Sequence, residues 1–212
     1  MVQEALEVLE GITPDFEIII IDDGSTDGTG PMADALAAKH PSLKVIHHAV
    51  NSGYGAALQS GFRAAAKELV FYTDGDHQFD LKELPGIFPL IEQYDIVSCY
   101  RINRQEGLMR RINAFGWTRL VCLLFHLNLK DIDCAFKLYK RKIFENMTLV
   151  STGALIDTEV LARAVRKGYT IVQVGVHHYP RRAGTSTGSK LSVIIKAFYE
   201  LWKLRKRILR QP

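Results

Sequence analysis

Four isoleucines followed directly by two aspartates constrain the fold of this chain more than any other feature. They lie in FEIIII, residues 16–21, and their β-branched side chains favour an extended strand. Because the apolar residues follow one another without polar alternation, the pattern predicts a parallel strand that is buried on both faces. The run ends at Asp22-Asp23-Gly24, where a polar loop begins. In open α/β sheets such loops, at the carboxyl ends of strands, are where ligands bind.

Segments with strand and helix patterns alternate along the chain. The predicted strands cover residues 16–21, 43–48, 69–73, 94–99, 132–139 and 170–176. The predicted helices cover residues 2–10, 30–40, 54–67, 81–93, 108–127, 155–167 and 190–209. This alternation predicts an α/β fold with a mostly parallel sheet flanked by helices.

The composition is that of a globular domain, since 47% of the 212 residues are hydrophobic and 24% are charged. We expect one domain over residues 1–189 and a basic helix over 190–212. No apolar run reaches about 18 residues and the first residues carry no basic group, so neither a membrane-spanning helix nor a signal peptide is expected. The widely spaced Cys99, Cys122 and Cys134 predict neither a disulfide framework nor a zinc site, and they suit the cytoplasm.

Positive charge is concentrated at the C-terminus. Residues 190–212 hold seven Lys and Arg residues and one Glu, a net charge of +6, whereas the whole chain carries +4. A mildly acidic body with a basic tail argues against nucleic-acid binding, for which a basic body is typical. On a helix over 190–209 the apolar residues share one face; they are Leu191, Ile194, Ile195, Phe198, Leu201 and Trp202.

This basic amphipathic helix has two interpretations. It is typical of a helix that lies on an anionic membrane, and Leu204, Ile208 and Leu209 favour this interpretation because they widen the apolar side. The alternative is a helix whose apolar face packs on the domain core while its charged face is solvated. We expect residues 190–209 to make peripheral contact with the cytoplasmic face of a membrane.

The strongest chemical signal is Asp74-Gly75-Asp76, which directly follows the predicted strand 69–73. Two carboxylates one residue apart can present oxygens to one hard cation, and Gln78 can add an amide oxygen. The motif predicts a Mg²⁺ or Mn²⁺ site that connects the protein to substrate phosphates. The alternative is a polar turn without a metal, because Asp and Gly are common in turns.

Three further segments are candidate ligand sites. Asp22 and Asp23 predict contacts with ribose hydroxyls or a base edge; the alternative is that Asp23 or Ser25 caps the next helix. Gly53 lies in NSGYGAAL, a glycine-rich helix entry that suits an anion, but no phosphate-loop pattern is complete and a plain loop–helix junction is the alternative. Arg181 begins a loop of small residues that could close over a diphosphate.

Taken together and in this order, EIIIIDDGSTDGT, NSGYGAAL and FYTDGDHQFD resemble the inverting glycosyltransferase family 2, which has the GT-A fold. The likeness is greater to the branch of dolichyl-phosphate mannose synthase and bacterial polyprenyl-phosphate sugar transferases. KDIDCAFKLYKR, STGALIDTEVLARAVRKGY and VHHYPRRAGTSTG are similar to later motifs of that branch. The resemblance covers about residues 5–190.

The resemblance implies roles for individual residues. Asp74, Asp76 and Gln78 match the metal ligands of the family. The donor nucleotide would meet Asp22, Asp23, Gly53, Asp74 and Arg181, of which Arg181 would face the diphosphate. The acceptor phosphate would meet Arg110, Arg111, Arg119 and Lys137.

Three departures from the family pattern are visible. The usual first strand, which ends in Pro-x-Tyr-Asn-Glu, is not present in this sequence, so we expect a GT-A sheet truncated at the N-terminus. Lys137 stands where many relatives have Arg, and the two side chains are not equivalent at a phosphate. Thr187 stands where a Lys is usual.

The implied function is an inverting, metal-dependent hexosyltransferase that moves a sugar from a GDP- or UDP-sugar to polyprenyl or dolichyl phosphate at the membrane surface. If the acceptor were a hydroxyl, a base would be required, and Asp157 is the first candidate with Glu159 second. One alternative is a catalytically inactive glycosyltransferase-like module, or a fragment, that binds a nucleotide or lipid. A sugar nucleotidyltransferase is less favoured because no Gly-rich basic loop follows the first strand. The sequence makes no prediction of the oligomeric state.

Overall fold

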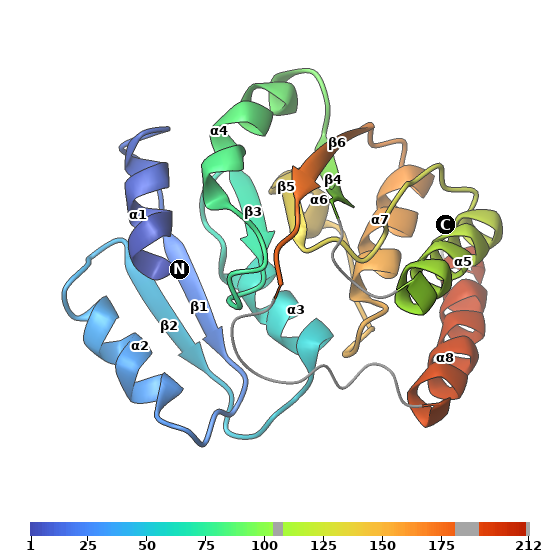
Figure 1. Ribbon diagram of the computed structural model, residues 1–212, viewed down its shortest axis with the longest axis horizontal. Helices are drawn as coiled ribbons and strands as arrows, with labels where there is room; N and C mark the ends of the chain where they lie inside the picture. The colour runs from blue at the N-terminus through green and yellow to red at the C-terminus, as the bar shows by residue number, and fades with distance from the viewer. Residues whose placement is uncertain (104–107, 181–190, 211–212) are drawn as a thin grey trace.

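The computed structural model describes residues 1–103, 108–180 and 191–210 (Figure 1). The strands are β1 (Ile18–Asp22), β2 (Leu43–His47), β3 (Leu69–Thr73), β4 (Ile96–Ile102), β5 (Phe136–Lys140) and β6 (Ile171–His177). The α-helices are α1 (Val2–Glu10), α2 (Thr29–Ala37), α3 (Tyr54–Ala64), α4 (Leu84–Ile87), α5 (Leu108–Phe125), α6 (Lys142–Glu145), α7 (Ile156–Arg166) and α8 (Leu191–Arg210). Short 3₁₀ helices are η1 (Leu81–Glu83) and η2 (Phe88–Glu92).

The strands form a two-stranded sheet, β1-β2, and a four-stranded sheet in the order β3-β5-β4-β6. The expected parallel pairing holds for β1 with β2 and for β4 with β6. Strand β5 is the exception, because it runs antiparallel to both β3 and β4 and makes the larger sheet mixed. The α/β class is therefore confirmed, with a sheet that is less uniformly parallel than expected.

The isoleucines of β1 are only partly buried, although their pattern predicts a strand buried on both faces. Within the described part of the chain, β1 pairs with β2 alone and β3 pairs with β5 alone. Helices α2 and α3 pack against β1. With a single hydrogen-bonded neighbour, β1 cannot reach the burial of a central strand.

The predicted helix over 81–93 is broken into η1, α4 and η2. Pro85 and Pro89 stand in the first positions of α4 and η2, respectively. Proline has no amide hydrogen and is tolerated in a first turn but not inside a helix. The two prolines therefore divide what the apolar periodicity alone suggests is one helix.

The core lies around the four-stranded sheet, whose strands β4 and β5 contain fully buried residues such as Ile96 and Phe136. An aromatic cluster joins α3, β3, β5 and α6; its members are Phe62, Tyr72, Tyr139 and Phe144. Phe62 and Phe144 stack with their ring centroids 4.1 Å apart. Such contacts add to area burial and connect segments far apart in the sequence.

Helix α8 packs on the domain with the stripe Leu201, Leu204 and Ile208, which are 1–3% exposed and belong to the core. The alternative of a core-packing helix therefore holds for this stripe. Leu204 and Ile208 face the protein, so the expectation that they widen a membrane-facing side is wrong. In the described ranges, no helix combines the length and apolar character needed to span a membrane.

The two ends of the molecule differ in architecture (Figure 1). Strands β1 and β2 lie with α2 at one end, and α5 and α8 lie together at the other. The loop after β3 lies between these ends. The predicted boundary at residue 190 stays a prediction, because residues 181–190 lie outside the described ranges.

Candidate active site

The turn after β3 brings the predicted metal ligands together on one short loop. The amide N–H of Gln78 donates to Oδ1 of Asp76 at 3.2 Å, which closes the turn. The side chain of Gln78 is oriented by a 3.1 Å hydrogen bond from Nε2 to the carbonyl of Tyr179. This bond uses the amide nitrogen of Gln78 and leaves its oxygen as an acceptor for a further group.

Asp74 occupies an environment that disfavours its charged form. Burial and the neighbouring carboxylate of Asp76 raise the pKa of Asp74 to about 6, although a hydrogen bond from Tyr54 opposes the shift. A divalent cation offsets such like-charge repulsion, and two carboxylates with an amide oxygen are the donors that Mg²⁺ or Mn²⁺ prefers. Among the described residues no three His, Cys, Asp or Glu side chains form a metal-binding group.

Asp22 and Asp23 hold two loops in place through nearly all of their oxygens. Asp22 accepts from the backbone N–H of Ser25 at 3.0 Å and contacts Nδ1 of His47 at 2.9 Å. Hydrogen bonds from Ser25 and His47 lower the pKa of Asp22 to about 2. A nucleoside hydroxyl at Asp22 would have to compete with these donors.

Asp23 connects the loop after β1 to the entry of α3. It accepts from the N–H groups of Ser52 at 2.9 Å and Gly53 at 2.8 Å, and it contacts His48 at 2.6 Å. The adjacent carboxylates therefore fix the geometry of the edge where β1 and β2 end. Their predicted contact with the nucleoside stays a prediction.

The glycine-rich entry to α3 serves a close packing contact. The N–H groups of Gly55 and Ala56 both donate to the carbonyl of Thr152, at 2.9 and 3.2 Å. A Cβ on Gly55 would lie 2.4 Å from the carbonyl oxygen of Ser151. Gly53 has φ +99°, a conformation that glycine tolerates best. These contacts fit the alternative of a plain loop–helix junction. They occupy the amide N–H groups of Gly55 and Ala56, which an anion bound at this helix start would need.

A buried polar cluster lies between β3, β5 and α7. The ammonium of Lys137 is bonded to Oδ1 of Asp157 at 2.8 Å and to the Tyr72 hydroxyl at 3.1 Å, and it also donates to the carbonyl of Cys134. The Tyr72 hydroxyl donates to Asp157. Burial alone would lower the pKa of Lys137, but Asp157 raises it above its ordinary value. Lys137 is fully buried and already paired, which does not suit its predicted contact with an acceptor phosphate.

Glu159, the second predicted base, anchors a loop. Its carboxylate accepts from the N–H groups of Val150 and Ser151, at 3.0 and 2.8 Å, and from Nε of Arg163 at 2.8 Å. Its side chain has no exposed surface. Asp157 is likewise bound by Lys137 and Tyr72, so this arrangement suits neither carboxylate to take a proton from a substrate.

Asp131 and Asp133, the acidic pair at the start of the predicted strand 132–139, were assigned no role from the sequence. Asp131 forms a two-point contact with Arg101, at 2.7 and 2.8 Å. Asp133 is exposed, yet desolvation by the protein around it, together with the charges of Asp157 and Asp131, raises the pKa of Asp133 to about 7. The sequence signal that points to Asp133 is its place in an acidic pair at a strand end.

The structure describes only some of the side chains predicted to bind phosphates. Arg111 and Arg119 are exposed on α5, and the Arg119 guanidinium lies 5.0 Å from the ring centroid of Phe115. Arg181, and the side chain of Arg110, lie outside the described residues. The contact of these four residues with phosphates stays a prediction.

Solved structures with this arrangement of elements exist. The chain matches glucosyl-3-phosphoglycerate synthase from Mycobacterium tuberculosis in complex with Mn²⁺, UDP-glucose and phosphoglyceric acid, with a TM-score of 0.71, 16% identity and coverage of 96% of this chain and 74% of that one. The complex of that enzyme with UDP gives a TM-score of 0.70 at 17% identity. At this identity the likeness shows the fold alone, and it confirms the expected GT-A fold.

Curated relatives include undecaprenyl-phosphate 4-deoxy-4-formamido-L-arabinose transferases. The protein from Yersinia enterocolitica is 29% identical over 193 residues, and the one from Yersinia pestis strain Pestoides F is 30% identical over the same length. The match covers 90% of this chain but 58% of each relative. A family model, Glycosyl transferase family 2, matches residues 1–148. Because that match covers more than half of the sequence, the chain belongs to glycosyl transferase family 2.

Proposed function

We propose that this chain is an inverting glycosyltransferase that moves a sugar from a nucleotide-sugar donor, GDP- or UDP-linked, to a polyprenyl phosphate. Membership of the family and the names of the relatives support the reaction class and the lipid phosphate. The structural relatives were solved with UDP, UDP-glucose and Mn²⁺, which supports a UDP-sugar and a divalent metal.

The donor side of the proposal rests on the turn after β3. Asp74, Asp76 and the amide oxygen of Gln78 would hold Mg²⁺ or Mn²⁺, which would neutralise the leaving diphosphate when bound. The polar loops that Asp22 and Asp23 organise would lie along the nucleoside. Arg181 would add positive charge at the diphosphate.

The acceptor side rests on one observation: both carboxylates predicted as a base are already bound by protein cations. Asp157 is paired with Lys137, and Glu159 with Arg163. A hydroxyl acceptor requires a base, whereas a phosphate acceptor is already anionic and attacks without losing a proton. The arrangement therefore favours a phosphate. If the acceptor were a hydroxyl, Asp133 would be the candidate base, because its pKa is raised to about 7.

The proposed reaction needs little proton transfer by the protein. The acceptor phosphate oxygen attacks the anomeric carbon from the face opposite the leaving group, so the configuration inverts. Arg111 and Arg119 would hold the acceptor phosphate as it approaches, together with Arg110. The buried pair of Lys137 and Asp157 would keep the floor of the site rigid behind the turn after β3.

We also propose that residues 190–209 contact the cytoplasmic face of a membrane, where a polyprenyl phosphate would be found. The stripe that faces the core cannot make this contact, but Tyr199, Trp202 and Leu209 are exposed on α8. The ammonium of Lys206 lies 3.4 Å from the ring centroid of Trp202. Exposed aromatic and basic residues together are typical of helices at an anionic interface.

Calorimetric titration of the purified chain with UDP and with GDP, with and without Mn²⁺, tests the donor site. We expect Mn²⁺-dependent binding of one nucleotide, loss of that binding in Asp74→Ala, and no loss in Asp15→Ala, which changes an exposed carboxylate elsewhere. Transfer of radiolabelled sugar to undecaprenyl phosphate tests the reaction. Nucleotide binding without transfer would support the catalytically inactive alternative, and absence of binding would contradict the donor site.

A further inference from the structure

His47, the last residue of β2, contacts carboxylates from two different elements. Its Nδ1 lies 2.9 Å from Oδ2 of Asp22 at the end of β1, and its Nε2 lies 2.9 Å from Oδ1 of Asp34 on α2. Asp22 and His47 are register partners in the parallel pair of β1 and β2, so the first contact follows from the strand pairing. Together the three side chains form a histidine bridge between the strand pair and α2.

The partners of His47 determine the charge of its ring. An ionised carboxylate only accepts hydrogen bonds, so each ring nitrogen of His47 has to donate one. A neutral imidazole has a single N–H group and the imidazolium has two, so the complete bridge requires the charged ring. Hydrogen bonds to Asp34 and Asp22 outweigh partial desolvation and raise the pKa of His47 above its ordinary value.

The charged groups that act on the His47 ring are acids. They are Asp34 on α2 and Asp22 on β1, and Asp27 in the intervening loop adds a further acid that interacts with Asp22. The first turn of α2 covers this contact closely, because a Cβ on Gly30 would lie 2.7 Å from Oδ2 of Asp22 and 3.4 Å from Cε1 of His47. Acids around the ring favour its charged form.

The histidine bridge closes the loop between β1 and α2, residues 23–28. Asp22 directly precedes this loop, and Asp34 follows it on the helix. The other oxygen of Asp22, Oδ1, accepts from the N–H of Ser25 at 3.0 Å, inside the loop. The charged ring of His47 therefore holds the elements on both sides of a loop that the proposed function places along the nucleoside.

We propose that His47 is a positioning residue for the donor nucleotide: as a cation it holds Asp22 and Asp34 together and fixes the loop 23–28. The inference rests on the proposed donor site. When the ring loses a proton, one nitrogen becomes an acceptor that faces a carboxylate, and that side of the bridge opens. The loop then has its binding geometry for a smaller fraction of the time, and the apparent affinity for the nucleotide falls by that fraction.

Nucleotide binding should therefore depend on pH in a defined direction. His47 is charged below its raised pKa, so the bridge is complete at lower pH and opens as the pH rises through that pKa. Asp74 produces the opposite trend, because its carboxylate ionises above about pH 6 and can then hold a metal. A substitution in the bridge changes only the first trend, which separates the two.

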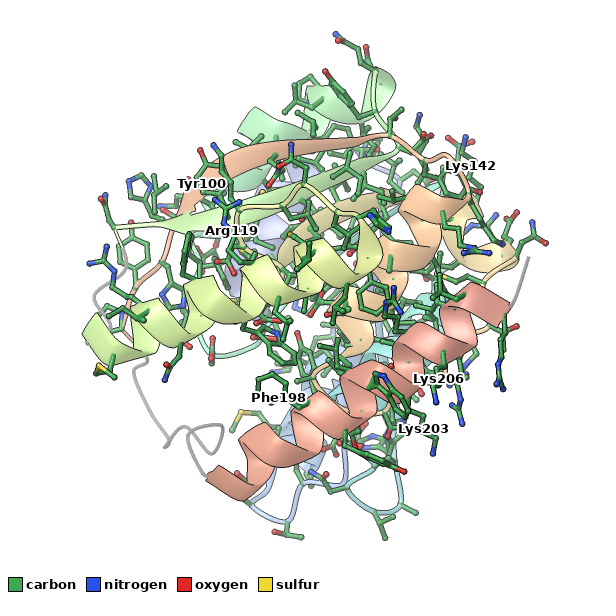
Figure 2. All side chains as sticks on the ribbon, turned by 90° about the vertical axis from the view of Figure 1, so that its right-hand side faces the viewer. Tyr100, Arg119, Lys142, Phe198, Lys203 and Lys206 are labelled. Atoms are coloured by element: carbon green, nitrogen blue, oxygen red, sulfur yellow. The ribbon has the colours of Figure 1, made fainter. Side chains whose placement is uncertain are left out.

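The bridge lies at the opposite end of the molecule from the cations proposed to hold the acceptor phosphate. Strands β1 and β2 and helix α2 form one end (Figure 1). Helices α5 and α8 form the other and face the viewer in Figure 2, where Arg119 is labelled on α5. Substitutions at His47 or Asp34 should accordingly change nucleotide binding without changing the contact of Arg119 with an acceptor phosphate.

Two titrations of the full chain test the inference. Two-bond ¹H–¹⁵N NMR spectra follow the charge of the His47 ring, and calorimetry follows the binding of UDP and of GDP with Mn²⁺, from about pH 6 to about pH 8.5. We expect nucleotide affinity to fall about fivefold as the ring is deprotonated, which corresponds to the loss of one hydrogen bond. Asp34→Asn removes one acid and should move the midpoints of both titrations to lower pH.

The variants are chosen so that the fold is preserved. The Asp34 side chain is 60% exposed, so Asp34→Asn should fold like the unaltered chain. His47→Gln should bind the nucleotide about fivefold more weakly at about pH 6 and lose the decline at higher pH. His40→Gln is the matched control, because His40 lies between α2 and β2 and outside the bridge, and its pH profile should stay unchanged.

The outcomes separate this inference from the proposed function. A His47 ring that titrates at or below the value of an unperturbed histidine would overturn the inference. Identical pH profiles of nucleotide affinity for the unaltered chain, Asp34→Asn and His47→Gln would also overturn it and would leave the donor site intact. Failure of the unaltered chain to bind either nucleotide would contradict the donor site itself and, with it, the positioning role of His47.

Discussion

The ammonium of Lys137 lies 2.8 Å from Oδ1 of Asp157, and protein encloses both side chains. The pair joins the start of β5 to the first turn of α7, and the Tyr72 hydroxyl joins β3 to the same carboxylate. Charges buried in this way are tolerated because each has its partner. The pair thus connects three elements directly beneath the acidic turn after β3.

Breaking this pair on one side should be costly. Lys137→Met leaves the Asp157 carboxylate buried without its cation, so we expect a loss of about 3–5 kcal/mol in the free energy of unfolding. Urea unfolding measures it. Lys140→Met, on the same strand but partly exposed beside Asp95, should cost about 1 kcal/mol or less.

The second partner provides a check on the same pair. Adding Asp157→Leu to Lys137→Met removes the unpaired charge, and most of the lost stability should return. Equal losses for Lys137→Met and Lys140→Met would contradict the burial of the pair.

The helix entry at α3 gives a prediction about two helical glycines. A Cβ on Gly55 would meet the carbonyl oxygens of Ser151 and Gly153 at 2.4 and 2.6 Å, so Gly55→Ala should destabilise the protein by about 2 kcal/mol or more. Gly86, on α4, has open space around the same position, and Gly86→Ala should be neutral or stabilising by up to about 1 kcal/mol. Thermal unfolding compares the two, and similar shifts would contradict the close approach.

Asp74 should show a conflict between stability and binding. Because burial and Asp76 raise the pKa of Asp74 to about 6, ionisation of Asp74 costs stability in the metal-free protein above about pH 6. Asp74→Asn should therefore stabilise the metal-free chain at pH 8 by about 1 kcal/mol, and the gain should fade as the pH drops below 6. The variant should at the same time lose Mn²⁺-dependent nucleotide binding. A melting temperature at pH 8 that falls in the variant would contradict this account.

The ionised form of Asp95 should stabilise the protein, whereas that of Asp74 destabilises it. Burial opposes its charge, but hydrogen bonds from Thr170 and the ammonium groups of Lys140 and Lys142 lower the pKa of Asp95 to about 2. A lowered pKa stabilises the fold above the unfolded value near 4, and this contribution is lost as the pH falls to about 2. Because Asp95 lies near solvent, which screens its ion pairs, Asp95→Asn should remove about 1 kcal/mol at neutral pH and flatten the stability profile between about pH 4 and pH 2. Denaturant unfolding across this range measures the profile, and a parallel curve for the variant would contradict the assignment.

The sequence alone determined most of the elements and the positions of several loops after them. The positions of β2 and β3 were predicted to within one residue, because a strand is encoded by local preferences of consecutive side chains. The acidic turn at Asp74 was visible for the same reason, since it follows a strand directly. Even the break at Pro85 is a local property, although the apolar period obscured it.

Only the tertiary structure decided which groups remain available to a ligand. Lys137 and Asp157 are 20 residues apart and Tyr72 is 85 residues from Asp157, so no local pattern could show that the three bind one another. The same holds for α8, where packing on the core buries Leu201 and leaves the neighbouring Trp202 exposed. The periodicity of apolar residues is encoded locally, whereas the partner of a buried polar side chain comes from distant elements that pack around it. Burial selects this partner, because an unpaired buried polar group is costly and a paired one is tolerated.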